Sequence, residues 1–148
     1  MTTKRNIIGI LFAVAIGLAA ASPSFAAPKA SSGSKGGGKG GGATGSFSLV
    51  MVTDQNGNGL PNWGDGITFD VSTTASLPYV EVSCYQGGVK VYTQRAGFYA
   101  GYAWTRTYTL QGFYWTGGAA DCNAVLTSWN SSGTSSTTLA TMSFPAYA

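Results

Sequence analysis

The sequence predicts an all-β domain, an antiparallel β-sandwich of about seven strands, over residues 47–148. Three observations support this fold class. From Phe47 onward Thr, Val, Tyr, Phe and Trp dominate, and these residues favour strands. Apolar and polar residues alternate in most of the segments, and no segment after residue 30 repeats with the period of a helix. Clusters of Gly, Asn and Ser separate the segments at the short intervals expected of turns.

The alternation indicates that each strand has one buried face and one exposed face. In the second segment, for example, Ile67, Phe69 and Val71 alternate with polar residues. The pair Gly87-Gly88, between the third and fourth segments, is typical of a tight hairpin. The order of the strands in the sheets cannot be derived from this pattern. The predicted strands cover residues 47–53, 66–73, 79–86, 88–95, 105–112, 121–129 and 136–144.

Residues 1–26 have the three parts of a cleaved secretory signal peptide. Lys4 and Arg5 form a positive start, and residues 7–21 are an uncharged apolar run. Residues 24–26 (Ser-Phe-Ala) then place small side chains around a cleavage point. The apolar run has about 15 residues, fewer than the roughly 20 that a membrane-spanning helix needs. We therefore expect a secreted or cell-surface protein with no membrane insertion after cleavage. An uncleaved N-terminal anchor is the alternative.

Residues 27–46 are rich in Gly, Ser and Lys and predict a flexible linker, because such residues leave the backbone unrestrained. Its lysines either stay solvated or are weakly attracted to anionic cell-wall or membrane polymers. The predicted domain then keeps Lys90, Arg95 and Arg106 against five carboxylates, a net charge of −2. A mildly acidic surface with scattered cations lacks the electrostatic footprint of nucleic acid binding. We therefore expect no nucleic acid partner.

The two cysteines, Cys84 and Cys122, both fall on the apolar phase of predicted strands. In an oxidising compartment such a pair predicts one buried disulfide, between neighbouring strands or between facing sheets. Two buried free thiols are the alternative. The chain has no histidine and only these two thiols, so a zinc site is excluded.

The segment between the first two predicted strands has the spacing of a calcium-binding loop. Counted from Asp54 as position 1, side-chain oxygens fall at positions 1, 3 and 5, a glycine at 6 and a carboxylate at 12. Only two ligands are charged, so the affinity would be weak, roughly 10⁻⁴ to 10⁻³ M. A metal-free polar turn built from the same residues is the alternative. The candidate calcium ligands are Asp54, Asn56, Asn58, the carbonyl of Leu60, Asn62 and Asp65.

Strands flank this loop, whereas an EF-hand has helices there. The segment resembles the D-x-N-x-N-G-x-x-x-x-G-D-x-I-T-F motif of secreted bacterial immunoglobulin-like domains. The resemblance is close only around residues 54–69 and elsewhere is limited to the strand pattern. It implies an immunoglobulin-like β-sandwich with a structural or adhesive role, often with calcium between the first two strands. The matching residues are Asp54, Asn56, Asn58, Gly59, Gly64, Asp65, Ile67, Thr68 and Phe69.

Aromatic side chains gather in residues 98–104 and again in residues 113–115. Exposed rings can stack on sugar faces or anchor a protein partner, whereas buried rings would close the ends of the sandwich. The first segment contains Gly101, which favours a loop or a bulged strand edge. The candidate ligand-binding residues are Tyr99, Tyr102 and Trp104.

The residue inventory argues against an enzyme. Without histidine there is no Ser-His triad, and no pair of the few carboxylates stands out as an acid–base pair. We therefore expect an exported, non-enzymatic binding or structural domain whose partner is an extracellular protein or a glycan. A carbohydrate-binding module that uses the aromatic residues is one alternative. A subunit of a surface filament or virion, joined through strand edges, is another.

Overall fold

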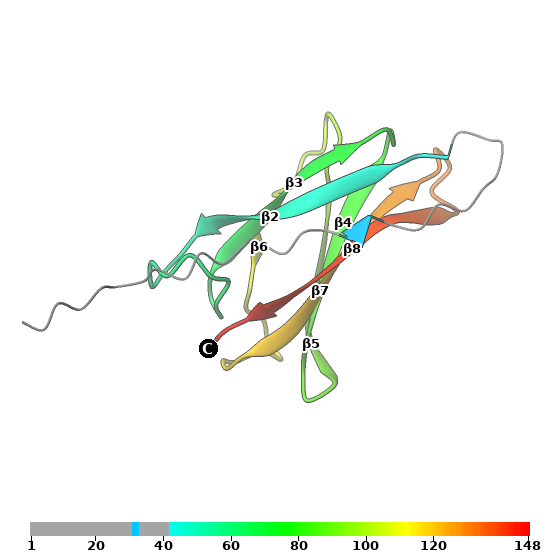
Figure 1. Ribbon diagram of the computed structural model, residues 1–148. Coiled ribbons are helices and arrows are strands. Elements are labelled where there is room, and N and C mark those ends of the chain that lie inside the picture. The colour runs from blue at the N-terminus through cyan, green and yellow to red at the C-terminus, as the bar shows by residue number, and fades with distance from the viewer. Residues whose placement is uncertain (1–30, 33–41) are drawn as a thin grey trace, which may run out of the picture.

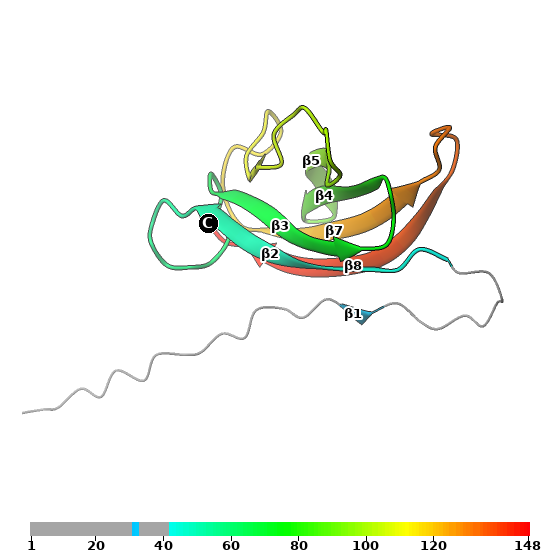
Figure 2. The same cartoon turned by 90° about the horizontal axis from the view of Figure 1, so that it is seen from above.

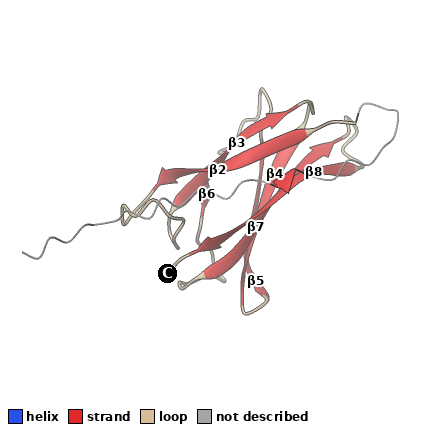
Figure 3. Cartoon of the chain, viewed as in Figure 1, coloured by secondary structure: helices blue, strands red, loops and turns tan. Residues whose placement is uncertain are grey.

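The computed structural model describes residues 31–32 and 42–148 of the chain. The regular structure in this part of the chain is β-strand throughout (Figures 1 and 3). The predicted signal peptide and most of the predicted linker lie outside the described residues. The strands are β1 (Ser31–Ser32), β2 (Gly45–Thr53), β3 (Gly66–Thr73), β4 (Pro78–Gln86), β5 (Val89–Gly97), β6 (Tyr108–Thr109), β7 (Ala120–Trp129) and β8 (Ser136–Ala146).

The strands form two antiparallel sheets. One sheet has the order β1-β8-β7-β4-β5 and the other has the order β2-β3-β6. Figure 2 shows the two layers, with β7 and β8 as long, curved strands. From β2 onward, the chain changes sheet after β3, after β5 and again after β6. The predicted all-β fold with two antiparallel sheets is therefore confirmed.

The core fills the space between the sheets. Every second residue of a strand contributes its side chain to the core, because successive side chains point to opposite faces of the sheet. On β4 the side chains of Val80, Val82 and Cys84 are buried. The smaller sheet contributes the buried side chains of Ile67 and Phe69, which pack in the same cluster. The residues of β4 that alternate with Val80, Val82 and Cys84 lie on the outer face of the larger sheet.

Tyr108 ties the two sheets together. It belongs to β6 of the smaller sheet, and its hydroxyl donates to the carbonyl of Val80 on β4 at 2.8 Å. Its ring meets Phe69 edge to face, with 5.4 Å between the ring centroids. Burial raises the pKa of the Tyr108 hydroxyl above its ordinary value, because the ionised form would lose its hydration.

Six of the seven predicted strands are confirmed, with ends that move by no more than one or two residues. The predicted hairpin at Gly87-Gly88 is also confirmed. The two glycines join β4 to β5 with φ angles of 56° and 83°, a conformation that side chains with a Cβ rarely adopt.

The predicted strand 105–112 is wrong in its extent, because only Tyr108–Thr109 pair with β3. The neighbouring residues find other partners. Arg106 donates from Nε to the carbonyl of Gly97 at 3.0 Å, and Leu110 donates from its backbone N–H to the carbonyl of Asp65 at 2.8 Å. The regular ladder with β3 is therefore limited to the two residues of β6.

β2 begins at Gly45, so it includes the last two residues of the predicted linker 27–46. A Cβ at Gly45 would lie 2.9 Å from Cδ2 of Leu126, so a larger residue at this point would require the Leu126 side chain to shift. Within the predicted linker, Ser31–Ser32 also pair with β8, opposite Thr141 and Ala140. A Gly- and Ser-rich composition does not exclude backbone pairing, because pairing needs no apolar side chain.

Cys84 and Cys122 form the predicted disulfide. They lie directly opposite each other on β4 and β7, with 4.0 Å between their Cα atoms, and both are buried. The bridge therefore joins neighbouring strands of one sheet and does not join the two sheets. In the described part of the chain there is no free cysteine.

Candidate functional site

The two predicted sites lie at opposite ends of the sandwich (Figure 1). The loop 54–65 joins β2 to β3 and is held against Tyr147, near the C-terminus, by two backbone hydrogen bonds. The segment 98–107 follows the C-terminal end of β5, which pairs with the start of β4. The calcium hypothesis and the aromatic hypothesis therefore concern two separate surfaces.

Asp54 closes the first half of the loop with its carboxylate. Its Oδ1 accepts the N–H of Gly57 at 2.8 Å, and its Oδ2 accepts the N–H of Gly59 at 2.7 Å. Both glycines have positive φ angles, 69° and 73°, which let the backbone turn its N–H groups toward one carboxylate. In the same turn Oδ1 of Asn56 accepts the N–H of Asn58 at 3.1 Å.

Asp65, at the end of the loop, is fully buried. Its Oδ1 accepts the N–H of Gln55 at 2.9 Å, and its Oδ2 accepts the backbone N–H and the side-chain Nδ2 of Asn62 at 2.9 and 3.3 Å. The same Nδ2 donates to the carbonyl of Leu60 at 2.7 Å and to Oδ1 of Asn58 at 3.1 Å. The oxygens at positions 5, 7 and 12 of the loop therefore converge on one amide nitrogen.

In this arrangement the loop is closed by hydrogen bonds from the side-chain amide of Asn62. Calcium needs six to eight oxygen ligands around one centre, whereas here an N–H donor stands where three of the candidate oxygens meet. Turning the side-chain amide of Asn62 would replace Nδ2 by Oδ1 and supply another oxygen. Calcium binding stays a prediction that requires this rearrangement. Among the residues that the structure describes, no three His, Cys, Asp or Glu side chains form a group.

A comparison of melting temperatures distinguishes the two interpretations of the loop. Weak calcium binding would stabilise the fold by about 1 to 2 kcal/mol at about 5 mM Ca²⁺. Because Asn62 already satisfies the converging oxygens, we expect the same melting temperature in about 5 mM EDTA and in about 5 mM Ca²⁺. Mg²⁺ at the same concentration is the control for ionic strength. A rise in melting temperature with Ca²⁺ alone would contradict this expectation and support the calcium site.

The predicted binding residues Tyr99, Tyr102 and Trp104 are brought together, and Tyr79 of β4 joins them. The ring centroids of Tyr99 and Tyr102 are 5.5 Å apart, and those of Tyr102 and Trp104 are 5.3 Å apart. The Tyr79 ring lies 5.4 Å from that of Tyr99, and the two hydroxyls share a hydrogen bond of 2.9 Å. This hydrogen bond raises the pKa of Tyr99 above its ordinary value. We call these four residues the aromatic cluster.

The loop that carries the aromatic cluster is held in place at its base. The guanidinium of Arg106 donates to the carbonyls of Gly97 and Tyr99, at 3.0 and 2.8 Å. A Cβ at Gly97 would come within 2.5 Å of the Tyr99 ring and 2.6 Å of the Tyr102 ring, so the glycine permits the rings to approach. Tyr99 and Tyr102 are half-buried, whereas Trp104 is 73% exposed and ends the cluster in solvent.

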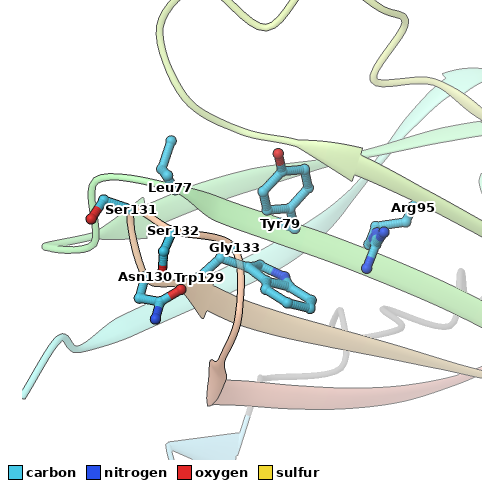
Figure 4. A pocket seen from close by; sticks show the side chains of 8 residues that line it. All are labelled: Leu77, Tyr79, Arg95, Trp129, Asn130, Ser131, Ser132 and Gly133. Carbon is cyan, nitrogen blue, oxygen red and sulfur yellow. The ribbon is translucent and has the colours of Figure 1, made fainter.

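A groove of about 390 Å³ continues from the aromatic cluster through Tyr79. Figure 4 shows Tyr79 and Trp129 side by side along the groove, with Arg95 at one end and Ser131 at the other. We call it the aromatic groove. Its lining residues are Leu77, Tyr79, Arg95, Trp129, Asn130, Ser131, Ser132 and Gly133.

The sequence analysis did not select Tyr79, Arg95 or Trp129 as binding residues. They come from three strands, β4, β5 and β7, and their proximity depends on a strand order that the sequence does not reveal. A signal was present for Tyr79, because it stands on the polar phase of its strand next to the buried Val80. A large aromatic residue on an exposed phase is a candidate for binding.

In the aromatic segment 113–115, which was not selected for binding, Phe113 and Tyr114 are 90% and 78% exposed, the highest values among the aromatic residues of the described chain. They form the tip of a turn whose ends, Gly112 and Trp115, are paired by backbone hydrogen bonds. Trp115 is buried beneath the tip. The glycines on both sides of this segment were the signal for an exposed turn.

Comparisons of the chain with models of known protein families, with characterised proteins and with solved structures find no match. Within residues 31–32 and 42–148 there is no helix of the length and hydropathy needed to cross a membrane.

Proposed function

We propose that the described domain is an immunoglobulin-like sandwich. If β2 to β8 are taken as the strands A, B, C, C′, E, F and G, the two sheets become A-B-E and G-F-C-C′. This division supports the proposal, because immunoglobulin-like domains likewise place A, B and E in one sheet and C, F and G in the other. The disulfide departs from antibody domains: it joins C to F within one sheet, whereas theirs joins B to F between sheets.

We further propose that the protein is an exported, non-enzymatic domain that binds a glycan on its aromatic cluster and aromatic groove. The N-terminal sequence supports export, and the disulfide fits an oxidising compartment. The observation that carries the proposal is the row of aromatic rings from Trp104 through Tyr102 to Tyr79, together with Trp129, which lines the same groove as Tyr79. Polar side chains of the loop 130–133 lie beside these rings and can bind sugar hydroxyls.

The groove itself favours a glycan over a peptide. β4 and β7, which carry Tyr79 and Trp129, are each hydrogen-bonded to a neighbouring strand on both sides. A peptide therefore finds no free strand edge beneath these two rings to which it could add. Recognition must depend on the ring faces and on side-chain hydrogen bonds, and a sugar ring offers both an apolar face and hydroxyl groups.

Binding of a panel of soluble oligosaccharides, neutral and acidic, tests the proposal by calorimetry. For an oligosaccharide that binds, we expect Trp104→Ala to weaken affinity about tenfold, because an exposed aromatic anchor contributes about 1.4 kcal/mol or more. Phe113→Ala is the matched control, since it removes another exposed ring outside both binding surfaces and should leave affinity unchanged. No binding of any oligosaccharide at about 1 mM would reject a glycan ligand.

A further inference from the structure

In the aromatic groove the guanidinium of Arg95 lies close to two aromatic rings. Its guanidinium carbon lies 5.7 Å from the centroid of the Tyr79 ring and 5.5 Å from that of the Trp129 ring. Such contacts favour a cation over a ring face and restrict the guanidinium to a few orientations. Because the five N–H groups of arginine lie in the plane of the guanidinium, stacking on rings leaves them available to another partner.

Within residues 31–32 and 42–148, the guanidinium of Arg95 donates no hydrogen bond. Arg106, on the neighbouring loop, differs because it donates to two backbone carbonyls. Glu81 lies directly opposite Arg95 across β4 and β5, yet no ion pair joins them within the described part of the chain. The guanidinium of Arg106 therefore stabilises the fold through its hydrogen bonds, whereas that of Arg95 does not.

The positive charge of the groove favours a ligand with a negative charge. Arg95 is the one ionised side chain among the lining residues, and no carboxylate lines the groove. A ligand that covers the rings also displaces water from this guanidinium. A neutral ligand would displace this water without supplying a countercharge inside the groove, which is costly, whereas an anionic group would pair with the guanidinium there through charge-assisted hydrogen bonds.

We propose that the ligand is an acidic glycan whose carboxylate pairs with Arg95 while its sugar rings lie on Tyr79 and Trp129. This inference rests on the proposed glycan-binding function and names its substrate class. A carboxylate is planar and matches the fork of the guanidinium with two parallel hydrogen bonds. At the other end of the groove, the side chains of Ser131 and Ser132 add hydroxyl groups to the lining (Figure 4).

The test compares an oligogalacturonate with the same oligomer in its methyl-esterified, uncharged form. We expect the wild-type protein to bind the acid about 10- to 100-fold more tightly than the ester, the effect of one charge-assisted contact. Arg95→Gln should abolish this preference. Lys90→Gln removes a cation of the same strand that does not line the groove, and it should leave the preference intact. Glu81→Gln removes the nearby competing carboxylate and should strengthen binding of the acid.

The outcomes separate this inference from the function on which it rests. Equal affinity for acid and ester would overturn the carboxylate contact and leave glycan binding standing. A sulfated, uronate-free oligomer that binds as tightly as the acid would overturn the choice of a carboxylate. Failure to bind these oligomers and every member of the neutral panel would overturn both proposals. If Arg95→Gln does not fold, the salt dependence of the wild-type protein decides, because affinity for the acid alone should fall with NaCl.

Discussion

Replacement of Cys84 and Cys122 together by alanine is expected to lower the free energy of unfolding by about 4 kcal/mol. The bond joins residues 38 positions apart, and without it the unfolded chain regains the freedom that closing such a loop removes. Urea unfolding measures the effect, and the dependence on urea should become steeper because the unfolded chain is more expanded.

The reduced wild-type protein is the control for this double variant. It keeps both sulfur atoms in the core between the sheets, so its loss of stability reports the cross-link alone. The double variant adds the loss of buried side-chain volume. If reduction changed the free energy of unfolding by less than about 1 kcal/mol, the cross-link would not be a main source of stability.

Asp65→Ala is expected to destabilise the domain by about 3 kcal/mol or more. The carboxylate is fully buried and accepts two backbone N–H groups and one side-chain N–H, which lose their partner together. Asp54→Ala removes a carboxylate from the exposed part of the same loop, where water can replace it. We expect that variant to cost only about 1 kcal/mol.

Thermal and urea unfolding of the two variants, side by side, measure this difference. Equal losses would contradict the assignment of Asp65 as the buried acceptor that organises the loop. Oligosaccharide binding provides a second measurement, because the loop and the aromatic groove lie at opposite ends of the sandwich. At a temperature where Asp65→Ala remains folded, its affinity should equal that of the wild-type protein.

The calcium hypothesis illustrates how one spacing permits two kinds of site. Asp, Asn and Gly at alternate positions place oxygens around a centre whether a metal or an amide group occupies it. Only the three-dimensional contacts show that Nδ2 of Asn62 reaches the oxygens of Asn58, Leu60 and Asp65. The spacing alone cannot distinguish the two, because a side-chain amide has a donor on one side and an acceptor on the other.

The aromatic segments illustrate a second limit. The sequence predicts rings at 98–104 as candidates for binding, and the structure brings Tyr99, Tyr102 and Trp104 into one cluster. It does not predict that Tyr79 and Trp129 join them, because these residues are far apart in the chain. The exposure of Phe113 and Tyr114 depends on a turn anchored by the buried Trp115, which no local pattern specifies.

The sequence by itself determined the strands, the hairpin at Gly87-Gly88 and the burial of both cysteines. These features follow from local rules: alternation places every second side chain on one face, and paired glycines permit the positive φ angles of a tight turn. Tertiary structure alone decided that β6 is only two residues long, that the disulfide lies within one sheet, and that Arg95 meets Tyr79 and Trp129. Each of these depends on which strands become neighbours. Packing between segments that are distant in the chain determines which strands are neighbours. The alternation of apolar and polar residues within one strand does not indicate which strand lies beside it.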